Sequence, residues 1–355
     1  IMPSLVGSEM CIRDRPTSAP VPVPRLAYSG GDMPAPAALP DPATLSQLHE
    51  RIGAWFRAHA RDLPWRGPER TAWEVMVSEF MLQQTPVNRV LPVWREWLRR
   101  WPTPAALAAE SPGEVLRAWG RLGYPRRALR LHAAAAAIVA EHDGEVPADR
   151  ETLLDLPGVG AYTAAAISVF AFGHRETVVD TNIRRVQARL ISRRALPGRG
   201  MTAAEMRLAE ALLPRDREDS VLWNIAVMEL GALVCTARSP RCEECPVLAD
   251  CAWVAAGRPE PEIAPKGQAW HGTDRQARGA LMAVLRAASA PVPRALLLDP
   301  RLPVQAHGPE ADDVVGAVRA LRRLEAPPEQ LRRCLDGLLA DGLAAEPTPE
   351  TVALP

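Results

Sequence analysis

The sequence predicts an all-α protein, and three observations support this. Apolar residues make up 47% of the 355-residue chain, a composition typical of a globular protein with a sizeable core. From Leu45 to about Gly257 these residues recur with helical spacing, and proline, glycine and capping residues divide the pattern into short helices. Strand patterns are nearly absent, and the stretch ETVVD (176–180) is a short extended segment at most.

We expect a helical domain over residues 41–257, because the periodic pattern fills this region. The helices expected there include Ser46–His59, Ala72–Leu82, Val87–Arg100, Pro112–Trp119, Arg126–Glu141, Arg150–Leu154, Ala161–Phe170, Asn182–Ser192, Ala203–Leu213 and Asp219–Val234.

The two ends of the chain differ from this domain. Residues 1–40 are rich in Pro, Gly, Ser and Ala without a periodic apolar face, so we expect disorder there. Residues 2–15 also resemble translated sequencing-adapter sequence, so this segment, Cys11 included, is treated as artefactual. A Pro-rich linker (258–273) leads to residues 274–355, where helices at Asp274–Ala288 and Pro328–Asp341 and the apolar end TVALP predict a small winged-helix-like domain.

The charge pattern bears on partners and location. The net charge is zero, but Asn88–His132 and Thr181–Arg217 each hold nine Arg against three acids. Such stretches indicate either a positive face for nucleic acid or solvated helix faces. No apolar run reaches the roughly 20 residues of a membrane span, and no secretory signal is present. We therefore expect a cytoplasmic protein.

Four of the six cysteines lie within one short segment, CTARSPRCEECPVLADC (235–251), at the spacing C-x6-C-x2-C-x5-C. Zinc sites usually contain two C-x2-C knuckles, or one with a histidine pair, and only one such knuckle occurs here. Four thiolates in a short loop suit the larger [4Fe–4S] cluster, with zinc or unligated thiols as alternatives. The expected ligands are Cys235, Cys242, Cys245 and Cys251.

The segment LLDLPGVGAYTAAAI (153–167) predicts a helix–hairpin–helix. A short helix ends near Leu156, the turn Pro157-Gly158-Val159-Gly160 follows, and a second helix begins at Ala161. Two glycines let the backbone approach closely and expose N–H groups at a helix N-terminus, which suits a DNA phosphate. A turn that only packs two helices together is the alternative.

Two carboxylates are candidates for chemistry. Asp180, in VVDTNIRRV, follows the hairpin by twenty residues; alone, it would be interpreted as a helix N-cap. Glu79 lies in the apolar helix around Phe80 and Met81, so we expect it to be buried rather than on an exposed face. A buried glutamate has a raised pKa and suits general-acid catalysis. Two carboxyl groups on either side of one N-glycosidic bond can protonate the leaving base and stabilise the sugar cation.

Together the hairpin, the aspartate beyond it and the four-cysteine loop resemble the endonuclease III superfamily of DNA glycosylases, where they occur in the same order. The resemblance covers about Leu45 to Ala256. It implies a helix–hairpin–helix DNA glycosylase fold of two helical subdomains with an iron–sulfur cluster loop. Within the superfamily the chain is most similar to adenine DNA glycosylases of the MutY type. Four segments carry this similarity: LPWR (63–66), SEFMLQQT (78–85), LGYPRRALRLH (122–132) and VDTNIRRV (179–186).

This resemblance implies the roles of the site residues. Glu79 protonates the adenine ring, Asp180 stabilises or transiently bonds C1′ of the sugar, and Asn182 supports the site. Gln84 and Tyr124 fill the space left by the flipped base, as base extrusion requires. The other residues expected to contact substrate or DNA are Trp65, Arg66, Pro157, Gly158, Val159, Gly160, Tyr162, Arg238 and Arg241.

Bifunctional relatives carry a Schiff-base lysine in the hairpin, where this chain has Tyr162. Lys266 is the only lysine of the chain, so no lysine nucleophile is available in the helical domain. We therefore expect a monofunctional enzyme that leaves an abasic site. A thymine-mismatch or oxidised-pyrimidine glycosylase and a non-catalytic DNA-binding module are the alternatives; MLQQT favours adenine over thymine.

The resemblance also implies the partner. We expect a monomer that binds double-stranded DNA containing adenine mispaired with 8-oxoguanine or guanine, and that associates with the bacterial nucleoid when bound to DNA. We expect no membrane partner. The family usually ends in a larger Nudix-like domain that recognises 8-oxoguanine, whereas only 104 residues follow Cys251 here. How this chain recognises 8-oxoguanine is therefore left open by its sequence.

Overall fold

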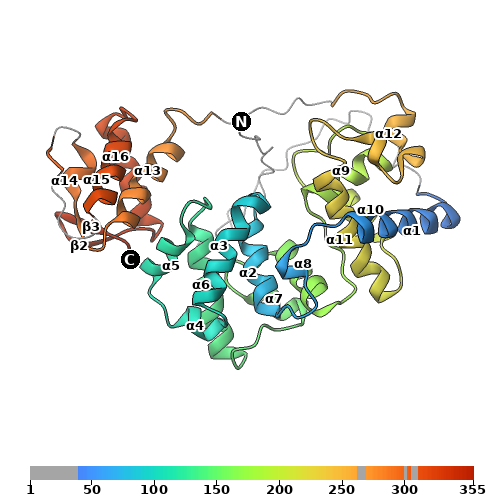
Figure 1. Cartoon of the computed structure of the whole chain (residues 1–355), viewed down its shortest axis with the longest axis horizontal. Helices are drawn as coiled ribbons and strands as arrows, with labels where there is room; N and C mark the ends of the chain where they lie inside the picture. Colours follow the sequence, from blue (N-terminus) through green and yellow to red (C-terminus); the bar gives the residue numbers. More distant parts are fainter. Residues whose placement is uncertain (1–38, 262–268, 300–301, 305–310) are drawn as a thin grey trace, which may run out of the picture. The chain divides into compact units, whose positions relative to one another are not determined.

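The structure is a computed structural model that describes residues 39–261, 269–299, 302–304 and 311–355. The predicted N-terminal segment, residues 1–40, lies outside this range apart from its last two residues, as do Lys266 and part of the predicted linker. The chain divides into two compact units. Figure 1 labels most of their helices and strands. One contains residues 71–159 and the described residues from 269 onwards, and the other contains residues 39–70 and 160–261.

Six helices form the helical part of the first unit. They are α2 (Ala72–Leu82), α3 (Val87–Arg100), α4 (Pro104–Ala108), α5 (Pro112–Trp119), α6 (Arg126–Glu141) and α7 (Arg150–Asp155). Helix α2 packs against α3 and α6, and α6 also contacts α4 and α5. Trp97 and Trp119 are fully buried and meet edge to face with their ring centres 5.5 Å apart, so aromatic packing joins α3 to α5.

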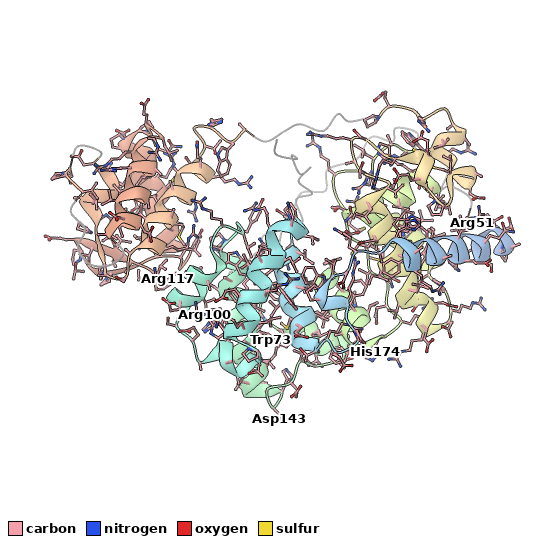
Figure 2. The ribbon with its side chains drawn as sticks, viewed as in Figure 1. Arg51, Trp73, Arg100, Arg117, Asp143 and His174 are labelled. Atoms are coloured by element: carbon pink, nitrogen blue, oxygen red, sulfur yellow. The ribbon has the colours of Figure 1, made fainter. Side chains whose placement is uncertain are left out.

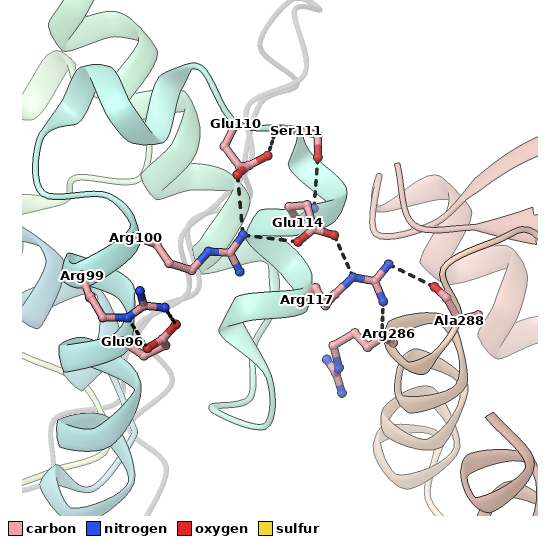
Figure 3. Close-up of polar contacts among 9 residues, drawn as sticks. All are labelled: Glu96, Arg99, Arg100, Glu110, Ser111, Glu114, Arg117, Arg286 and Ala288. Carbon is pink, nitrogen blue, oxygen red and sulfur yellow. Dashed lines mark hydrogen bonds and ion pairs between the residues drawn. The ribbon is translucent and has the colours of Figure 1, made fainter. Parts of the chain in front are cut away.

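Hydrogen bonds and ion pairs of side chains also connect the helices of this unit. Trp73, labelled in Figure 2, donates from its indole N–H to the Trp101 carbonyl at 3.1 Å and so attaches the start of α2 to the end of α3. The Arg100 guanidinium lies 3.6 Å from Glu110 and 3.3 Å from Glu114 (Figure 3). Figure 3 also shows Arg117, which pairs with Glu114 and donates to the Ala288 carbonyl at 3.0 Å.

In the C-terminal part of the same unit, the described residues form four helices and a small sheet. These are α13 (Asp274–Ala287), β1 (Val292–Pro293), α14 (Arg294–Leu298), α15 (Ala311–Arg322), α16 (Pro328–Ala340), β2 (Ala345–Thr348) and β3 (Thr351–Ala353). Helix α13 packs against α15 and α16. The antiparallel sheet has the order β1-β3-β2, with Val292 opposite Val352. Helices followed by a terminal β-hairpin are typical of a winged helix, as the sequence predicts.

Within its described residues, the second unit contains helices and loops but no strand. Its elements are α1 (Pro42–His59), η1 (Pro64–Arg66), α8 (Ala161–Phe172), α9 (Thr181–Leu190), α10 (Ala203–Leu212), α11 (Arg217–Leu233), η2 (Cys242–Glu244), η3 (Leu248–Asp250) and α12 (Ala252–Ala255). Helix α11 packs against α1 and α9. Ile52, Ile183 and Leu230 belong to one buried core cluster that joins these three helices.

The all-α fold with a small C-terminal winged-helix-like domain is confirmed, and the expected helices are present with ends that differ by a few residues. Helices α4, α12, α14 and α15 and strands β1 and β2 were not among the expected elements, whereas β3 falls on the apolar end TVALP, where a β-like segment was expected. The positions of the domain boundaries stay predictions. Within the described residues, no helix has the length and apolar character needed to cross a bilayer.

Candidate active site

Glu79 lies on α2, which is buried on nearly all sides. Thr71 and Glu74 begin this helix with a capping box: the Glu74 N–H donates to Thr71 Oγ1 at 3.2 Å, and Glu74 Oε2 accepts from the Thr71 N–H at 2.7 Å. A helix that is apolar all round is stable only inside a core. The Glu79 side chain belongs to that core, with 6% of the residue exposed, so its predicted burial is confirmed.

The hairpin turn packs tightly against α2 and α6. Gly158 has φ of +79°, a conformation that favours glycine. A Cβ at this position would lie 2.6 Å from Arg130 Cβ and 3.1 Å from Phe80 Cε1, so the site also lacks space for a side chain. Gly160, in contrast, is exposed at the N-cap of α8 and has open space around it. The turn therefore combines one glycine required for packing with another at an accessible helix N-terminus.

Asp180 is the N-cap of α9, as its position in the sequence allows. Its Oδ1 accepts from the Ile183 N–H at 2.6 Å, and its Oδ2 accepts from Asn182 Nδ2 at 2.7 Å. The cap and a catalytic role are therefore compatible, because the cap occupies one oxygen and Asn182 orients the other. Burial raises the pKa of the Asp180 carboxyl, while hydrogen bonds from Ile183 and Asn182 and the charge of Arg185 oppose this rise.

Arg185, which the sequence did not suggest, links Asn182 to the cysteine loop. Its Nη2 donates to Asn182 Oδ1 at 2.7 Å and to the Gly231 carbonyl at 2.6 Å. Its Nε donates to the Cys235 carbonyl at 2.7 Å. One guanidinium therefore connects the first cysteine of the loop to the amide that holds Asp180.

Gly231, on α11, permits this arrangement. A Cβ there would lie 2.7 Å from Asn182 Cβ and 2.8 Å from the Asn182 carbonyl oxygen. Although alanine favours a helix by about 1 kcal/mol, we expect Gly231→Ala to slow base excision about 10- to 100-fold, because Asn182 must move. Single-turnover excision kinetics measure this. Gly279→Ala, on α13 where a Cβ meets nothing within 4 Å, is the matched control and is expected to leave the rate unchanged.

The four cysteines of the loop surround one cavity. Cys235, Cys242, Cys245 and Cys251 line it together with Arg189 and Trp253. Arg189 Nη1 lies 3.3 Å from Cys235 Sγ, so a positive charge faces sulfur, as a cluster of thiolate ligands favours. These residues fit a [4Fe–4S] cluster, which crosslinks its four thiolate ligands and so organises the loop when bound.

Arg189, on α9, holds the cysteine loop in place. It is 3% exposed, its guanidinium stacks on the Trp253 ring at 4.8 Å, and it donates to the carbonyls of Ala195, Thr236 and Ala237.

The two interpretations of the Arg-rich stretches, a positive face or solvated helix faces, are both wrong for four arginines. Arg127, Arg184, Arg185 and Arg189 are buried.

The LPWR segment is attached to α11 through Glu229, a second residue that the sequence did not suggest. Glu229 is fully buried, and its oxygens accept from Arg61 Nε and Nη2 at 2.7 Å and from Arg66 Nη2 at 2.9 Å. Burial alone would raise the pKa of Glu229, but the hydrogen bonds and charges of Arg61 and Arg66 outweigh it and hold the pKa at about 2. Trp65 is buried beside this network.

We expect Glu229→Gln to destabilise the fold by about 3 kcal/mol at neutral pH, because the change from 4.5 to about 2 corresponds to that free energy. The folded-state pKa is lowered, so this stability is present above pH 4.5 and disappears as the pH falls towards 2. Urea unfolding of wild type and variant between pH 3 and pH 7 measures the difference, which must shrink in acid. Glu210→Gln, at an exposed position of α10, is the control.

The remaining predicted residues lie at surfaces. Gln84 and Tyr124 are exposed, in the same unit as Glu79. Tyr162 is half-buried against the core of the other unit, which also holds Asp180 and the cysteine loop. Arg241 is exposed, but it also pairs with Glu244 and donates to the Leu233 carbonyl at 2.6 Å, so it caps α11.

Comparison with known proteins assigns the family. A model described as the HhH-GPD superfamily base excision DNA repair protein matches residues 77–210, and one described as the iron–sulfur binding domain of endonuclease III matches residues 235–251. The adenine DNA glycosylase of Mycobacterium tuberculosis is 47% identical over 324 residues, which cover 90% of this chain and 98% of the relative. That of Mycolicibacterium smegmatis is 48% identical over 85% of this chain and 94% of the relative.

A solved structure, that of a thermostable thymine-DNA glycosylase, is 26% identical and aligns with a TM-score of 0.53 over 60% of this chain and 98% of the other. The match to the four-cysteine loop confirms the [4Fe–4S] prediction over zinc, and the repair-protein match confirms DNA as the partner. Because the similarity to the mycobacterial enzymes extends over nearly their whole length, the chain belongs to the adenine DNA glycosylases of the helix–hairpin–helix base excision repair superfamily.

Proposed function

We propose that the chain removes adenine paired with 8-oxoguanine or guanine in double-stranded DNA and leaves an abasic site. The observation that supports this most is the fixed Asp180 carboxylate, with one oxygen bonded to the Ile183 N–H and the other to Asn182. Such fixed charges stabilise a developing positive centre without reorganising during the reaction. The near full-length similarity to adenine glycosylases indicates the base.

The proposed reaction divides the work between two carboxyl groups. Glu79 gives a proton to the adenine ring, so the bonding electrons of the glycosidic bond pass to a neutral leaving base. Asp180 stabilises the positive charge that remains at C1′ of the sugar, and a water then adds to C1′ with loss of a proton. The burial of Glu79 supports its role as the acid, because it keeps the carboxyl group away from bulk water.

We further propose that the enzyme is monofunctional. Its only lysine, Lys266, lies outside the glycosylase region matched by the family models, so no lysine is available there to form a Schiff base. The expected result with borohydride is no covalent enzyme–DNA product above background. High-yield trapping would contradict the proposal.

Three duplexes separate the candidate functions: adenine opposite 8-oxoguanine, adenine opposite guanine, and thymine opposite guanine. Cleavage is assayed with hot alkali, because no lyase activity is expected to nick the strand. We expect product from the first two duplexes only. Product from the third alone would favour the thymine-mismatch alternative. The similarity to the structure of a thymine-DNA glycosylase is the reason to test it. No product from any duplex would favour an oxidised-pyrimidine glycosylase or a non-catalytic DNA-binding module, and a fourth duplex with an oxidised pyrimidine separates these two.

We propose that the hairpin turn 157–160, with Tyr162, and the cluster loop bind DNA phosphates, through accessible N–H groups and through Arg238 and Arg241 respectively. Both arginines are exposed. Replacing them with Ala is expected to weaken DNA binding and to reduce the slope of log K against log salt by about 1.8, as loss of two phosphate contacts requires. Fluorescence anisotropy across a salt series measures the slope. Arg57→Ala is the control for an exposed arginine, and thermal melting tests whether loss of the α11 cap unfolds the loop.

We propose that Trp65 and Arg66 contact the extruded adenine, since the buried network around Glu229 holds this segment in place. Trp65→Phe is then expected to raise KM for the mispaired duplex, measured well below the melting temperature because the smaller buried ring also lowers stability. An unchanged KM would contradict the proposal. We also propose that the enzyme acts as a monomer on nucleoid DNA in the cytoplasm. Sedimentation with a short duplex is expected to show one protein per DNA.

A further inference from the structure

Arg127, on α6, binds the C-terminal end of α2. Its guanidinium is buried, and Nη1 donates to the carbonyls of Phe80 at 2.9 Å and Met81 at 3.1 Å, and also to that of Gln83. The last carbonyls of a helix lack partners within the helix and need donors from elsewhere. Arg127 supplies those donors for the helix that carries Glu79.

The second nitrogen of the same guanidinium reaches another segment. Arg127 Nη2 donates to Thr85 Oγ1 at 2.9 Å and to the Gly123 carbonyl at 3.0 Å. The Thr85 hydroxyl in turn donates to the Leu122 carbonyl at 3.1 Å. One guanidinium and one hydroxyl thus connect residues 83–85, after α2, with residues 122–124, before α6.

Each connected segment contains a residue with a left-handed backbone. Gln84 has φ of +56° and Tyr124 has φ of +47°, and such values cost free energy for residues other than glycine. Three acceptors of Arg127 are sequence neighbours of these two residues: Gln83 and Thr85 flank Gln84, and Gly123 precedes Tyr124. Both left-handed residues are exposed, and the Tyr124 ring centre lies 5.5 Å from the guanidinium carbon of Arg127.

From this geometry we propose that Arg127 is a positioning residue that holds the Gln84 and Tyr124 segments together as a single wedge, which enters the helix stack as adenine is extruded. The proposal rests on the proposed roles of Gln84 and Tyr124. Strained backbone persists where surrounding contacts fix it. Arg127 donates to both segments, so its loss is expected to loosen both at once, although Trp119 also donates to the Gly123 carbonyl.

The test compares adenine that must be extruded with adenine that is already unpaired. Single-turnover excision is measured on a duplex with adenine opposite 8-oxoguanine and on one with a bulged adenine. We expect Arg127→Met to lose about 100-fold on the paired substrate and Thr85→Val about tenfold, because a mispositioned reacting group costs rates of this order. On the bulged substrate the loss is expected to be severalfold smaller, since extrusion costs least for an unpaired base.

Thr85→Val is the milder variant, because it removes only the hydroxyl link and keeps the main-chain acceptors of Arg127. It decides the question if Arg127→Met does not fold, as judged by thermal melting. Arg126→Met, at the exposed position next to Arg127, is the matched control and is expected to leave the ratio of the two rates unchanged. Equal losses on both substrates for Thr85→Val would overturn the proposal.

Tyr124→Ala separates this proposal from the one on which it rests. If Tyr124→Ala leaves paired excision unchanged, the wedge role of Tyr124 is wrong, whatever Arg127 does. If it slows paired excision, the double variant Arg127→Met/Tyr124→Ala is expected to be no slower than the slower single variant, because both act through one step. Multiplicative losses would show that Arg127 acts elsewhere.

Discussion

Asp180→Asn is expected to lower the single-turnover excision rate about a thousandfold, because it removes the negative charge that we propose stabilises the sugar cation. Asparagine is as good an N-cap as aspartate, so its side-chain oxygen can keep the bond from the Ile183 N–H. A residue that served only as a cap would therefore tolerate the change. Asp216→Asn, at the N-cap of α11, makes the same substitution where only a cap is present and is expected to keep full activity.

The same variant makes a prediction about stability. The pKa of Asp180 is raised by burial, so the folded state holds its proton more tightly than the unfolded state. Stability from this group is therefore present in acid and is lost as the pH rises from the ordinary 3.8 through the folded-state pKa. Asparagine does not titrate, so the unfolding free energy of Asp180→Asn relative to wild type must increase with pH across that window and then level off.

Urea unfolding of both proteins at a series of pH values measures this difference. A difference that stays constant with pH would show that Asp180 is not desolvated in the folded protein. The excision rate of wild type provides a second measurement, because catalysis needs the ionised carboxylate. Its acid limb is expected above pH 3.8, since the pKa is raised.

The helices could be predicted from the sequence because their ends are marked. Thr71 with Glu74 begins α2, and Asp149 caps α7. Helix α4 could not be predicted in the same way, because its five residues are too few to show a repeated apolar spacing. In α15 the spacing was present but not used: Val314, Val318 and Leu321 lie at i, i+4 and i+7.

Residue type and spacing predicted the four-cysteine loop and the burial of Glu79, which are confirmed, while the catalytic roles of Glu79 and Asp180 stay predictions. The residues that hold these groups could not be predicted. Nearly all basic residues of the chain are arginine, so composition does not distinguish the buried Arg127 and Arg185 from solvated arginines. Their partners are largely main-chain carbonyls, which every residue type carries, so no sequence pattern identifies them. Spacing alone could have raised the question for Arg185 and Arg189, which are one helical turn apart on α9.

These arginines suggest why an enzyme without evident redox chemistry carries a cluster. A loop closed by a cluster has a fixed backbone, and the Cys235 carbonyl is one of the main-chain oxygens that hold the Arg185 guanidinium against Asn182. Loss of the cluster would therefore disturb Asp180 through main-chain geometry, with no electron transfer required. Arg127 holds the end of helix α2 in a similar way, by donating to the main-chain carbonyls of Phe80 and Met81.

Glu79→Gln is expected to lower excision of adenine opposite 8-oxoguanine about a thousandfold, since glutamine keeps the shape of the side chain but cannot donate the proton as an acid. The variant is expected to bind an uncleavable duplex as tightly as wild type. Glu74→Gln is the matched control: it makes the same change earlier on α2, where glutamine also completes a capping box.

A substrate whose base is already cationic distinguishes acid catalysis from a structural role of Glu79. A 7-methyladenine opposite 8-oxoguanine leaves as a neutral base without receiving a proton, so Glu79→Gln should slow its release far less than that of adenine. Because Asp180 acts on the sugar and not on the base, Asp180→Asn should slow both substrates alike. Equal losses with Glu79→Gln would instead mean that the buried carboxyl on α2 only packs the helix, and the division of work between the two carboxyl groups would have to be abandoned.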